Sequence, residues 1–251
     1  MDSPFENRVA LVTGAGQGIG RAIARALAAR GAKVAVNDVE RGRADRVVAE
    51  IATAGGVAVA TVADVSSRSE VEAMMAEILR RLGRLDILVN GARVEPPRPE
   101  GLSCDEWWDR LMAVDLKGAY LCSTAAWEPM RRQGYGRVIN ISSVVALLGK
   151  VEDDWIAYSC AKAGLLGLTR SLARRGMRLG ITANAVAPDY IETEVMESRW
   201  GREKMDAMAA SVPIGRAGRP EEVADAVLFL AQAEFITGET INVNGGRFVL
   251  P

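Results

Sequence analysis

The chain has 251 residues, of which 49% are apolar and 25% charged, and its formal net charge at neutral pH is −1. This length suits one compact α/β domain, residues 1–251, better than two. The small, unconcentrated net charge argues against nucleic acid as a partner, and no apolar run is long enough to span a bilayer, so no membrane partner is expected. A polar amino terminus without an export signal predicts a cytoplasmic protein.

The sequence contains no histidine. This absence excludes every Ser-His-Asp or Cys-His mechanism and every metal site that relies on imidazole. The three cysteines, Cys104, Cys122 and Cys160, are odd in number and widely spaced, which is typical of reduced thiols. No cluster of cysteines or carboxylates has metal-ligand spacing, so we expect no catalytic metal. Proton transfer is left to tyrosine, lysine or carboxylate side chains.

Short apolar segments alternate with longer amphipathic ones along the chain. Continuous apolar runs are typical of buried parallel strands, and right-handed crossovers then place helices on both faces of one sheet. Helix starts are marked by capping-box spacing at Ser67 with Glu70 and at Ser103 with Glu106, and by Pro220. The pattern predicts a doubly wound α/β fold around a seven-stranded parallel sheet, with strands at 9–12, 33–38, 57–63, 85–90, 137–141, 182–187 and 240–243.

Unusual polar residues gather at one end of these expected strands. In open α/β sheets, ligands bind at the edge formed by the carboxyl ends of the strands. Random placement would spread such residues over both edges, so their clustering predicts a binding site there. The residues concerned are Asp38, Asp64, Asn90, Ser142, Ser143 and Pro188.

A glycine-rich string, Thr13 to Gly20, joins the first expected strand to the helical pattern at 21–30. Glycines there let the backbone approach a pyrophosphate, and the start of a helix presents free N–H groups to it. An acid, Asp38, ends the second strand, as a dinucleotide site requires. Its carboxylate can bind the ribose diol and would repel a 2′-phosphate, which favours NAD over NADP, although Arg41 could offset the charge. The expected contacts from the string are Gly14, Gln17, Gly18, Ile19 and Gly20.

Tyr158 and Lys162 are four residues apart in a helix-like stretch, 154–173, so both side chains lie on one face. A phenol is a poor base at neutral pH, but a nearby ammonium favours the phenolate. A surface tyrosine and lysine on an amphipathic helix would give the same spacing, so this pair alone does not establish a catalytic site.

The sequence closely resembles the short-chain dehydrogenase/reductase (SDR) family over nearly its full length. The resemblance rests on the joint occurrence, in order, of the string 13–20, Asp64-Val65, the segments 139–143, 158–162 and 184–188, and Gly238 with 243–246. It implies a Rossmann-type fold, NAD(P) as cofactor, and a Ser-Tyr-Lys site that converts secondary alcohols and ketones.

The resemblance also assigns roles to particular residues. Ser143, which the family pattern aligns in preference to Ser142, orients the substrate oxygen. Tyr158 exchanges its proton, and Lys162 binds the nicotinamide ribose while favouring the phenolate. Cofactor contacts are implied for Asp64 and Val65 at the adenine, for Ile191 and Thr193 at the carboxamide, and for Asn90 and Pro188.

Three positions depart from the family pattern. Arg93 stands where the family has the glycine of Asn-Asn-Ala-Gly, and the sequence leaves open whether it reaches the substrate, the pyrophosphate or only solvent. Asp115 takes the place of the fourth catalytic residue, an asparagine that helps to hold a water in the proton relay. If the backbone carbonyl holds this water, Asp115 could substitute for the asparagine. An ionised carboxylate near Lys162 would also stabilise the ammonium and could blunt the effect of the lysine on Tyr158. Asp189 follows Pro188 where the family usually has glycine.

The predicted function is NAD-dependent interconversion of a secondary alcohol and a ketone, with residues 189–212 as a substrate-binding lid. Ser143, Trp155, Asp189 and Tyr190 are the candidate substrate contacts. Two alternatives stay open: a 3-oxoacyl-thioester reductase, which Asp38 disfavours because such reductions usually use NADPH, and a weakly catalytic NAD(H)-binding homologue. The resemblance further implies a homotetramer or homodimer.

Overall fold

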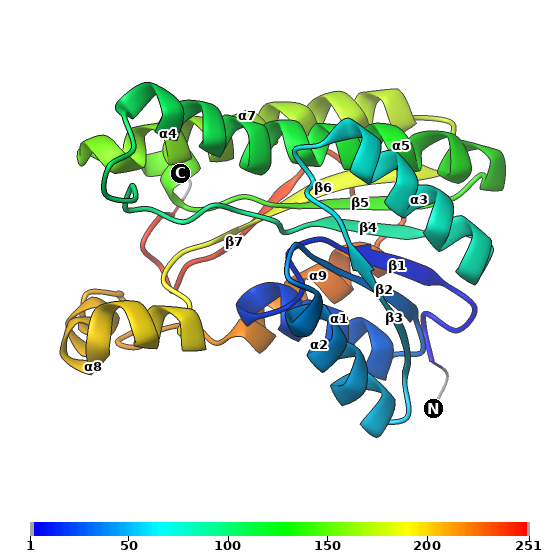
Figure 1. Cartoon of the computed structure of the whole chain (residues 1–251), viewed down its shortest axis with the longest axis horizontal. Helices are drawn as coiled ribbons and strands as arrows, with labels where there is room; N and C mark the ends of the chain where they lie inside the picture. The colour runs from blue at the N-terminus through cyan, green and yellow to red at the C-terminus, as the bar shows by residue number, and fades with distance from the viewer. Residues whose placement is uncertain (1–2, 250–251) are drawn as a thin grey trace.

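The computed structural model, which describes residues 3–249, has seven parallel strands in the order β3-β2-β1-β4-β5-β6-β7 (Figure 1). This is the doubly wound, Rossmann-type arrangement predicted from the alternating pattern. The strands are β1 (Val9–Val12), β2 (Lys33–Asp38), β3 (Val57–Val62), β4 (Ile87–Asn90), β5 (Gly136–Ile141), β6 (Ile181–Pro188) and β7 (Thr240–Val243).

Helices cover both faces of the sheet (Figure 1). One face carries α1 (Gly18–Ala29), α2 (Arg41–Thr53) and α9 (Pro220–Gln232), and the other carries α3 (Arg68–Leu82), α4 (Cys104–Leu111), α5 (Ala119–Gln133) and α7 (Asp153–Gly176). A π-helical turn, η1 (Met112–Gly118), joins α4 to α5, and the short α6 (Val145–Leu148) precedes α7. The helix α8 (Glu194–Ala210) stands apart from both layers and follows β6.

Strand β1 shows how one sheet supplies two cores. Ala10 and Val12 pack into the cluster under α1, α2 and α9, whereas Val9 and Leu11 pack into the cluster under α3, α5 and α7. Successive side chains of a strand point to opposite faces, so a strand covered on both sides must be apolar throughout. Strands β1, β2 and β7 have the predicted bounds.

The helix starts agree with the predicted caps except in one detail. Ser103 and Glu106 form a full capping box, and Pro220 begins α9. Ser67 caps α3 by accepting a hydrogen bond from the backbone of Glu70, but the Glu70 carboxylate accepts from the backbone N–H of Asp64 instead of closing the box. That second contact ties the end of β3 to the start of α3.

All three cysteines are free, and they differ in burial, which predicts that they differ in reactivity. Burial raises the pKa of the Cys122 thiol to about 12, whereas Cys104 and Cys160 are exposed. Because the thiolate is the nucleophile, we expect iodoacetamide at mildly alkaline pH to alkylate Cys104 and Cys160 in the folded protein and Cys122 only after unfolding. Peptide mass spectrometry measures this directly, and rapid native modification of Cys122 would contradict the packing of α5.

Within residues 3–249, the structure contains no helix with the length and apolar character needed to cross a membrane. The same residues bring together no group of three or more cysteine or acidic side chains that could hold a metal ion.

Candidate active site

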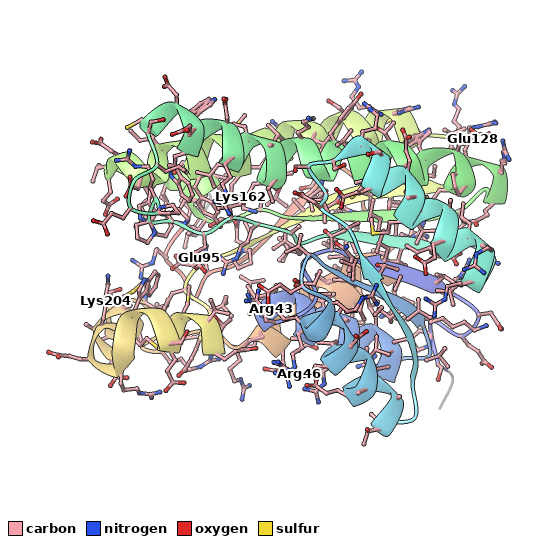
Figure 2. The ribbon with its side chains drawn as sticks, in the orientation of Figure 1. Arg43, Arg46, Glu95, Glu128, Lys162 and Lys204 are labelled. Carbon is pink, nitrogen blue, oxygen red and sulfur yellow. The ribbon has the colours of Figure 1, made fainter. Side chains whose placement is uncertain are left out.

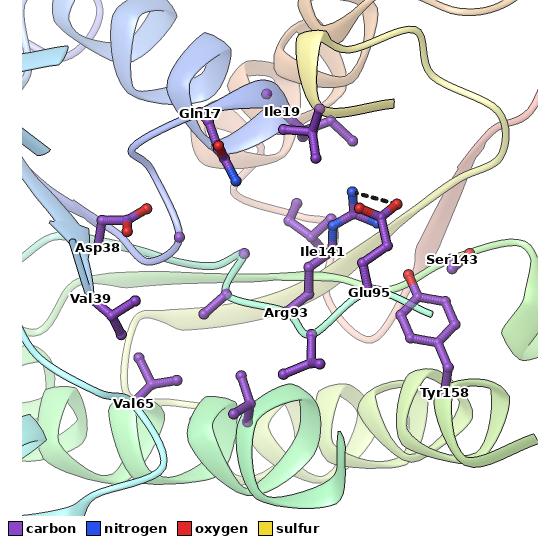
Figure 3. A pocket seen from close by; sticks show the side chains of 18 of the residues that line it. Gln17, Ile19, Asp38, Val39, Val65, Arg93, Glu95, Ile141, Ser143 and Tyr158 are labelled. Carbon is purple, nitrogen blue, oxygen red and sulfur yellow. Dashed lines mark ion pairs between the residues drawn. The ribbon is translucent and has the colours of Figure 1, made fainter. Parts of the chain in front are cut away.

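A groove of about 780 Å³ runs along the carboxyl ends of the strands, centred where the strand order turns from β1 to β4. Its size is typical of small-molecule and cofactor sites. Figure 3 shows Asp38 toward one side of this pocket and Ser143 and Tyr158 toward the other, with Arg93 between them. One continuous groove therefore contains both the expected adenosine end and the expected catalytic end.

The glycine string lines the groove, and close contacts with neighbouring backbone leave no room for side chains at two of its glycines. Gly14 has a φ of +65°, and a Cβ on it would lie 2.8 Å from the Cα of Ala92. A Cβ on Gly20 would lie 2.2 Å from the carbonyl oxygen of Gly14. The hydroxyl of Thr13 accepts hydrogen bonds from the backbone N–H groups of Gly91 and Ala92, which joins the string to the end of β4.

The amino terminus of α1 already holds an anionic oxygen. The carboxylate of Glu194, at the start of α8, accepts a hydrogen bond of 3.1 Å from the N–H of Gly18 and lies 3.6 Å from Arg21. No acidic residue lies in the first turn of α1, and its N-cap, Gln17, makes no side-chain capping bond. This N–H therefore faces the groove and accepts a negatively charged partner, as a pyrophosphate site requires.

Asp38 ends β2 with both carboxylate oxygens hydrogen-bonded to backbone. One accepts from the N–H of Gly16 at 3.1 Å and the other from the N–H of Glu40 at 3.0 Å. These bonds fix the carboxylate at the groove wall, where it is 6% exposed. The cation that lines the groove near it is Arg43, which pairs with Glu40 at 3.0 Å, and not Arg41.

Tyr158 and Lys162 lie on one face of α7, as the spacing predicts, and both line the groove. The Nζ of Lys162 donates to the carbonyl oxygen of Ile141 at 3.1 Å and lies 5.4 Å from the centre of the Tyr158 ring. Tyr158 is 5% exposed and Lys162 2%, so the phenol and the ammonium act in a poorly solvated environment. In that environment their electrostatic interactions are stronger than in water.

Asp115 comes from η1 and forms an ion pair with Lys162. Its Oδ2 lies 3.1 Å from Nζ, and its Oδ1 accepts a hydrogen bond of 2.7 Å from the backbone N–H of Val94. Both side chains are inaccessible, at 0% exposed for Asp115 and 2% for Lys162. Burial raises the pKa of Asp115, even though Lys162, the Val94 N–H and Arg93 all act to lower it.

Arg93 lies in the groove beside Tyr158. Its guanidinium forms an ion pair of 3.1 Å with Glu95, which Figure 3 shows. Burial lowers the pKa of Arg93, but Tyr158, Glu95 and Asp115 raise it, and the net direction is upward. Arg93 therefore lines the groove between Asp38 and Tyr158, and the choice between substrate and pyrophosphate as its partner stays open.

Ser142 and Ser143 have different partners. The hydroxyl of Ser142 donates to the backbone carbonyl of Lys162 at 2.8 Å and is buried. The hydroxyl of Ser143 has two long bonds of 3.4 Å, one donated to the carbonyl oxygen of Pro188 and one accepted from the N–H of Val145, and the residue is half-buried at the groove. Ser143 is thus the serine free to meet a ligand, in agreement with the family alignment.

Most of the predicted cofactor residues line the groove, but Asn90 does not. Its amide donates to Ser123 at 3.1 Å and to Asn140 at 2.8 Å beneath the strand end, so its contacts are with the protein interior. The predicted residues that line the groove are Gly14, Gln17, Gly18, Ile19, Gly20, Asp38, Asp64, Val65, Ser143, Tyr158, Lys162, Pro188, Asp189, Ile191 and Thr193.

Two of the candidate substrate contacts lie elsewhere. Trp155 packs edge-on against the Tyr158 ring, with centroids 5.6 Å apart, and is not among the groove-lining residues. Tyr190 is buried in a separate cluster with Met205 and Val212. Asp189 does line the groove and pairs with Arg247. Trp155 lies in the first turn of α7 and Tyr190 packs under α8, so neither ring lines the groove. The pattern of strands and helices in the sequence does not reveal these orientations.

Sequence reasoning missed Thr13, Glu95 and Glu194 as parts of the site. Thr13 stands beside the glycines, so its position could have suggested the role of its hydroxyl. Glu95 meets Arg93 through the conformation of one loop, and Glu194 meets Gly18 through tertiary packing, so no sequence signal identifies either contact.

Comparison with known proteins agrees with this geometry. A family model described as "Enoyl-(Acyl carrier protein) reductase" matches residues 14–247. A "3-oxoacyl-[acyl-carrier-protein] reductase" of Synechocystis sp. is 41% identical over 243 residues, covering 95% of this chain and 96% of the relative. The chain belongs to the short-chain dehydrogenase/reductase family of oxidoreductases.

Two solved structures agree over nearly the whole chain. A 7α-hydroxysteroid dehydrogenase complexed with NADH and 7-oxo glycochenodeoxycholic acid has a TM-score of 0.89 and 31% identity, covering 98% of this chain and 96% of that one. Levodione reductase has a TM-score of 0.88 and 32% identity, covering 97% and 98%.

Proposed function

We propose that the chain catalyses NAD-dependent interconversion of a secondary alcohol and a ketone. The observation that carries the proposal is the single groove that joins the glycine string and Asp38 to Ser143, Tyr158 and Lys162. A bound nicotinamide dinucleotide supplies the hydride acceptor for oxidation and the hydride donor for reduction. The carboxylate of Asp38 would hold its adenosine ribose, and the N–H of Gly18 would bind its pyrophosphate in place of the Glu194 carboxylate.

The chain's own residues then handle the proton. In the oxidation direction the carbinol carbon loses a hydride, the hydroxyl proton passes to the phenolate oxygen of Tyr158, and the carbonyl double bond forms. Reduction reverses each movement. Ser143 donates a hydrogen bond that orients the substrate oxygen. Lys162 donates one N–H to Ile141 and pairs with Asp115, and its ammonium keeps a donor for a ribose hydroxyl.

The residues at 189–212, which include α8, are proposed to form the substrate-binding lid. The segment begins with groove-lining Asp189, and α8 contains a non-helical residue, Gly201, with a φ of 72°. A break of this kind lets the two halves of α8 adjust separately around a bound substrate.

The preference for NAD is tested by the ratio of kcat/KM for NAD and NADP. Wild type is expected to favour NAD, and Asp38→Ala is expected to narrow that preference by lowering kcat/KM for NAD, because the ribose diol loses its acceptor while a 2′-phosphate loses a repelling charge. Asp45→Ala, at an exposed position on α2, is the matched control and should leave the ratio unchanged. A clear wild-type preference for NADP would overturn the assignment.

A second candidate is reduction of 3-oxoacyl thioesters. The Synechocystis relative and an Escherichia coli relative, 39% identical over 248 residues, both carry the name "3-oxoacyl-[acyl-carrier-protein] reductase". Parallel assays with 3-oxoacyl thioesters and with a panel of simple ketones and secondary alcohols separate the two. NADH binding without turnover in every assay would instead favour a weakly catalytic binding protein.

A further inference from the structure

The first turn of α8 is joined to the start of α1 by a carboxylate. Glu194 accepts a hydrogen bond of 3.1 Å from the N–H of Gly18, and its carboxylate lies 3.6 Å from the guanidinium of Arg21. Thr193 lies against the same glycine, since a Cβ added to Gly18 would be 3.4 Å from the Cγ2 of Thr193. The segment that opens the proposed lid therefore contacts the part of the glycine string where a pyrophosphate is expected.

Glu194 brings a negative charge to this position at neutral pH. Partial burial raises the pKa of Glu194, but the N–H of Gly18, its own backbone N–H and Arg21 lower it, and the net direction is downward. Arg21 is itself held by Glu50 of α2 through two hydrogen bonds of 2.8 and 2.9 Å. Its positive charge therefore stays at the start of α1 when Glu194 moves away.

The carboxylate and a pyrophosphate cannot use the N–H of Gly18 together. A backbone N–H is a single donor, and two anions at hydrogen-bond distance from it would repel each other. A dinucleotide that places its pyrophosphate there must displace Glu194. The apparent affinity for that dinucleotide is reduced accordingly, because only the fraction of the protein with a free N–H is ready to bind.

Displacing Glu194 also affects α8. The apolar side of this helix packs with Tyr190 and Val212 in a cluster that is separate from the two cores under the sheet. Figure 2 shows α8 extending away from the groove, with Lys204 far from Arg43. Loss of the Glu194 contact would thus detach the first turn of α8 from α1 and leave the packing of the rest of the helix intact.

We propose that Glu194 competes with the cofactor pyrophosphate for the start of α1, so that cofactor binding releases the first turn of the lid helix α8. The inference rests on the proposed function, because it takes the glycine string as the cofactor site and residues 189–212 as the lid. Glu194 is then a residue that sets the affinity for the cofactor. By linkage, the energy that holds Glu194 on Gly18 is the energy by which it weakens cofactor binding.

Calorimetric titration with ADP, NADH and adenosine tests the competition. Glu194→Ala removes both the charge and the acceptor and leaves Thr193 as the N-cap of α8. Its Kd for ADP and for NADH should be about two- to fivefold lower than that of wild type, the range that a partly exposed ion pair usually contributes. Glu194→Gln keeps an acceptor and should fall between the two. Adenosine has no phosphate and should bind all three proteins equally.

Glu197→Ala is the matched control. Glu197 is an exposed acid in the same first turn of α8, so this variant loses the same charge without touching the contact to Gly18. Its Kd for every ligand should match wild type. An equal fall in the Kd for ADP in both variants would show a general effect of charge and overturn the inference. An unchanged or higher Kd for ADP in Glu194→Ala, or an equal gain for adenosine, would overturn it as well.

Hydrogen exchange followed by mass spectrometry tests the release of α8. In wild type, ADP should speed amide exchange in peptides from the first half of α8, because the helix loses its contact with α1. In Glu194→Ala this exchange should already be fast without ADP, and ADP should change it little. If ADP slows the exchange of these peptides equally in both proteins, the helix is not released and the lid part of the inference is wrong.

The outcomes distinguish this inference from the proposed function. ADP binding involves no hydride transfer, so if no alcohol or ketone is turned over, the proposed function fails and the ADP titrations still decide the role of Glu194. A protein that turns over substrate but has the same Kd for ADP with and without Glu194 keeps its function and loses the inference. If ADP and NADH bind neither wild type nor Glu194→Ala, the start of α1 is not a pyrophosphate site and the inference is overturned.

Discussion

Replacing Tyr158 with phenylalanine is expected to lower kcat by about 10²- to 10⁴-fold, the usual contribution of a positioned proton donor or acceptor. Only the hydroxyl is lost, and the ring keeps its packing against Trp155 and the neighbouring residues of α7. The affinity for NADH should stay close to that of wild type, because the glycine string and Asp38 are untouched. Steady-state turnover and NADH fluorescence titration measure the two quantities separately.

The matched control is Tyr120→Phe. Tyr120 is 49% exposed on α5, and its hydroxyl has no place in the groove, so kcat should not change. If Tyr158→Phe retained wild-type turnover, the proton would have to move through another group, and the assignment of Tyr158 would be wrong. A parallel loss of NADH affinity would point instead to a structural effect on the groove.

The fold was predictable because its signals are local and repeated. A buried strand such as β1 is a short apolar run that must be covered on both faces, and helices between the runs provide the cover. The observed strand bounds differ from the predicted ones where apolar character does not decide where a strand begins. Leu85 and Asp86 were expected to open the fourth strand, but Asp86 is held by Arg8 and Arg84 before β4 begins at Ile87.

Many of the residues of the site could also be predicted from the sequence, but the ion pairs between their side chains could not. The spacing of Tyr158 and Lys162 fixes their common helix face, and the doubly wound pattern fixes their sheet edge. The sequence indicated what an ionised Asp115 near Lys162 would do, but not that the two side chains are in contact. The structure makes it a buried ion pair of 3.1 Å, because η1 turns the Asp115 carboxylate toward α7.

Side-chain contacts that depend on loop conformation or on burial were beyond sequence reasoning. Arg93 and Glu95 are two residues apart in a loop, a spacing that predicts nothing about their side chains, yet they meet in the groove beside Tyr158. The family resemblance implies a cofactor contact for Asn90, which stands at the end of a strand. Its amide bonds to Ser123 and Asn140 instead, so a residue at the correct edge of the sheet can still face the interior.

Removing the charge of Lys162 is expected to destabilise the protein by about 3–5 kcal/mol at neutral pH, the usual result of breaking a buried ion pair. In Lys162→Met the carboxylate of Asp115, 0% exposed, loses its counterion. Adding Asp115→Asn should recover much of the loss, because the amide oxygen can still accept the hydrogen bond from Val94. Urea unfolding of the cofactor-free protein measures the free energies of unfolding of wild type, of Lys162→Met and of the Lys162→Met/Asp115→Asn double variant.

The pH dependence of this loss has a definite sign. Burial raises the pKa of Asp115 above its ordinary value of 3.8, and removing Lys162 takes away a partner that lowers it. A carboxyl group whose pKa is raised by folding costs no stability below its unfolded value, and the cost grows as pH rises through the folded value. The deficit of Lys162→Met should therefore be smallest near pH 4, about the unfolded value, and increase toward neutral pH.

Lys117→Met provides the control, since Lys117 is an exposed lysine of the same π-helical turn that carries Asp115. Its stability should follow wild type at every pH. A Lys162→Met deficit that is constant with pH, or one that Asp115→Asn fails to reduce, would mean that lost packing of the lysine stem dominates. In that case Asp115 would not be a charge that Lys162 must neutralise, and its offset of Lys162 at Tyr158 would lose its physical basis.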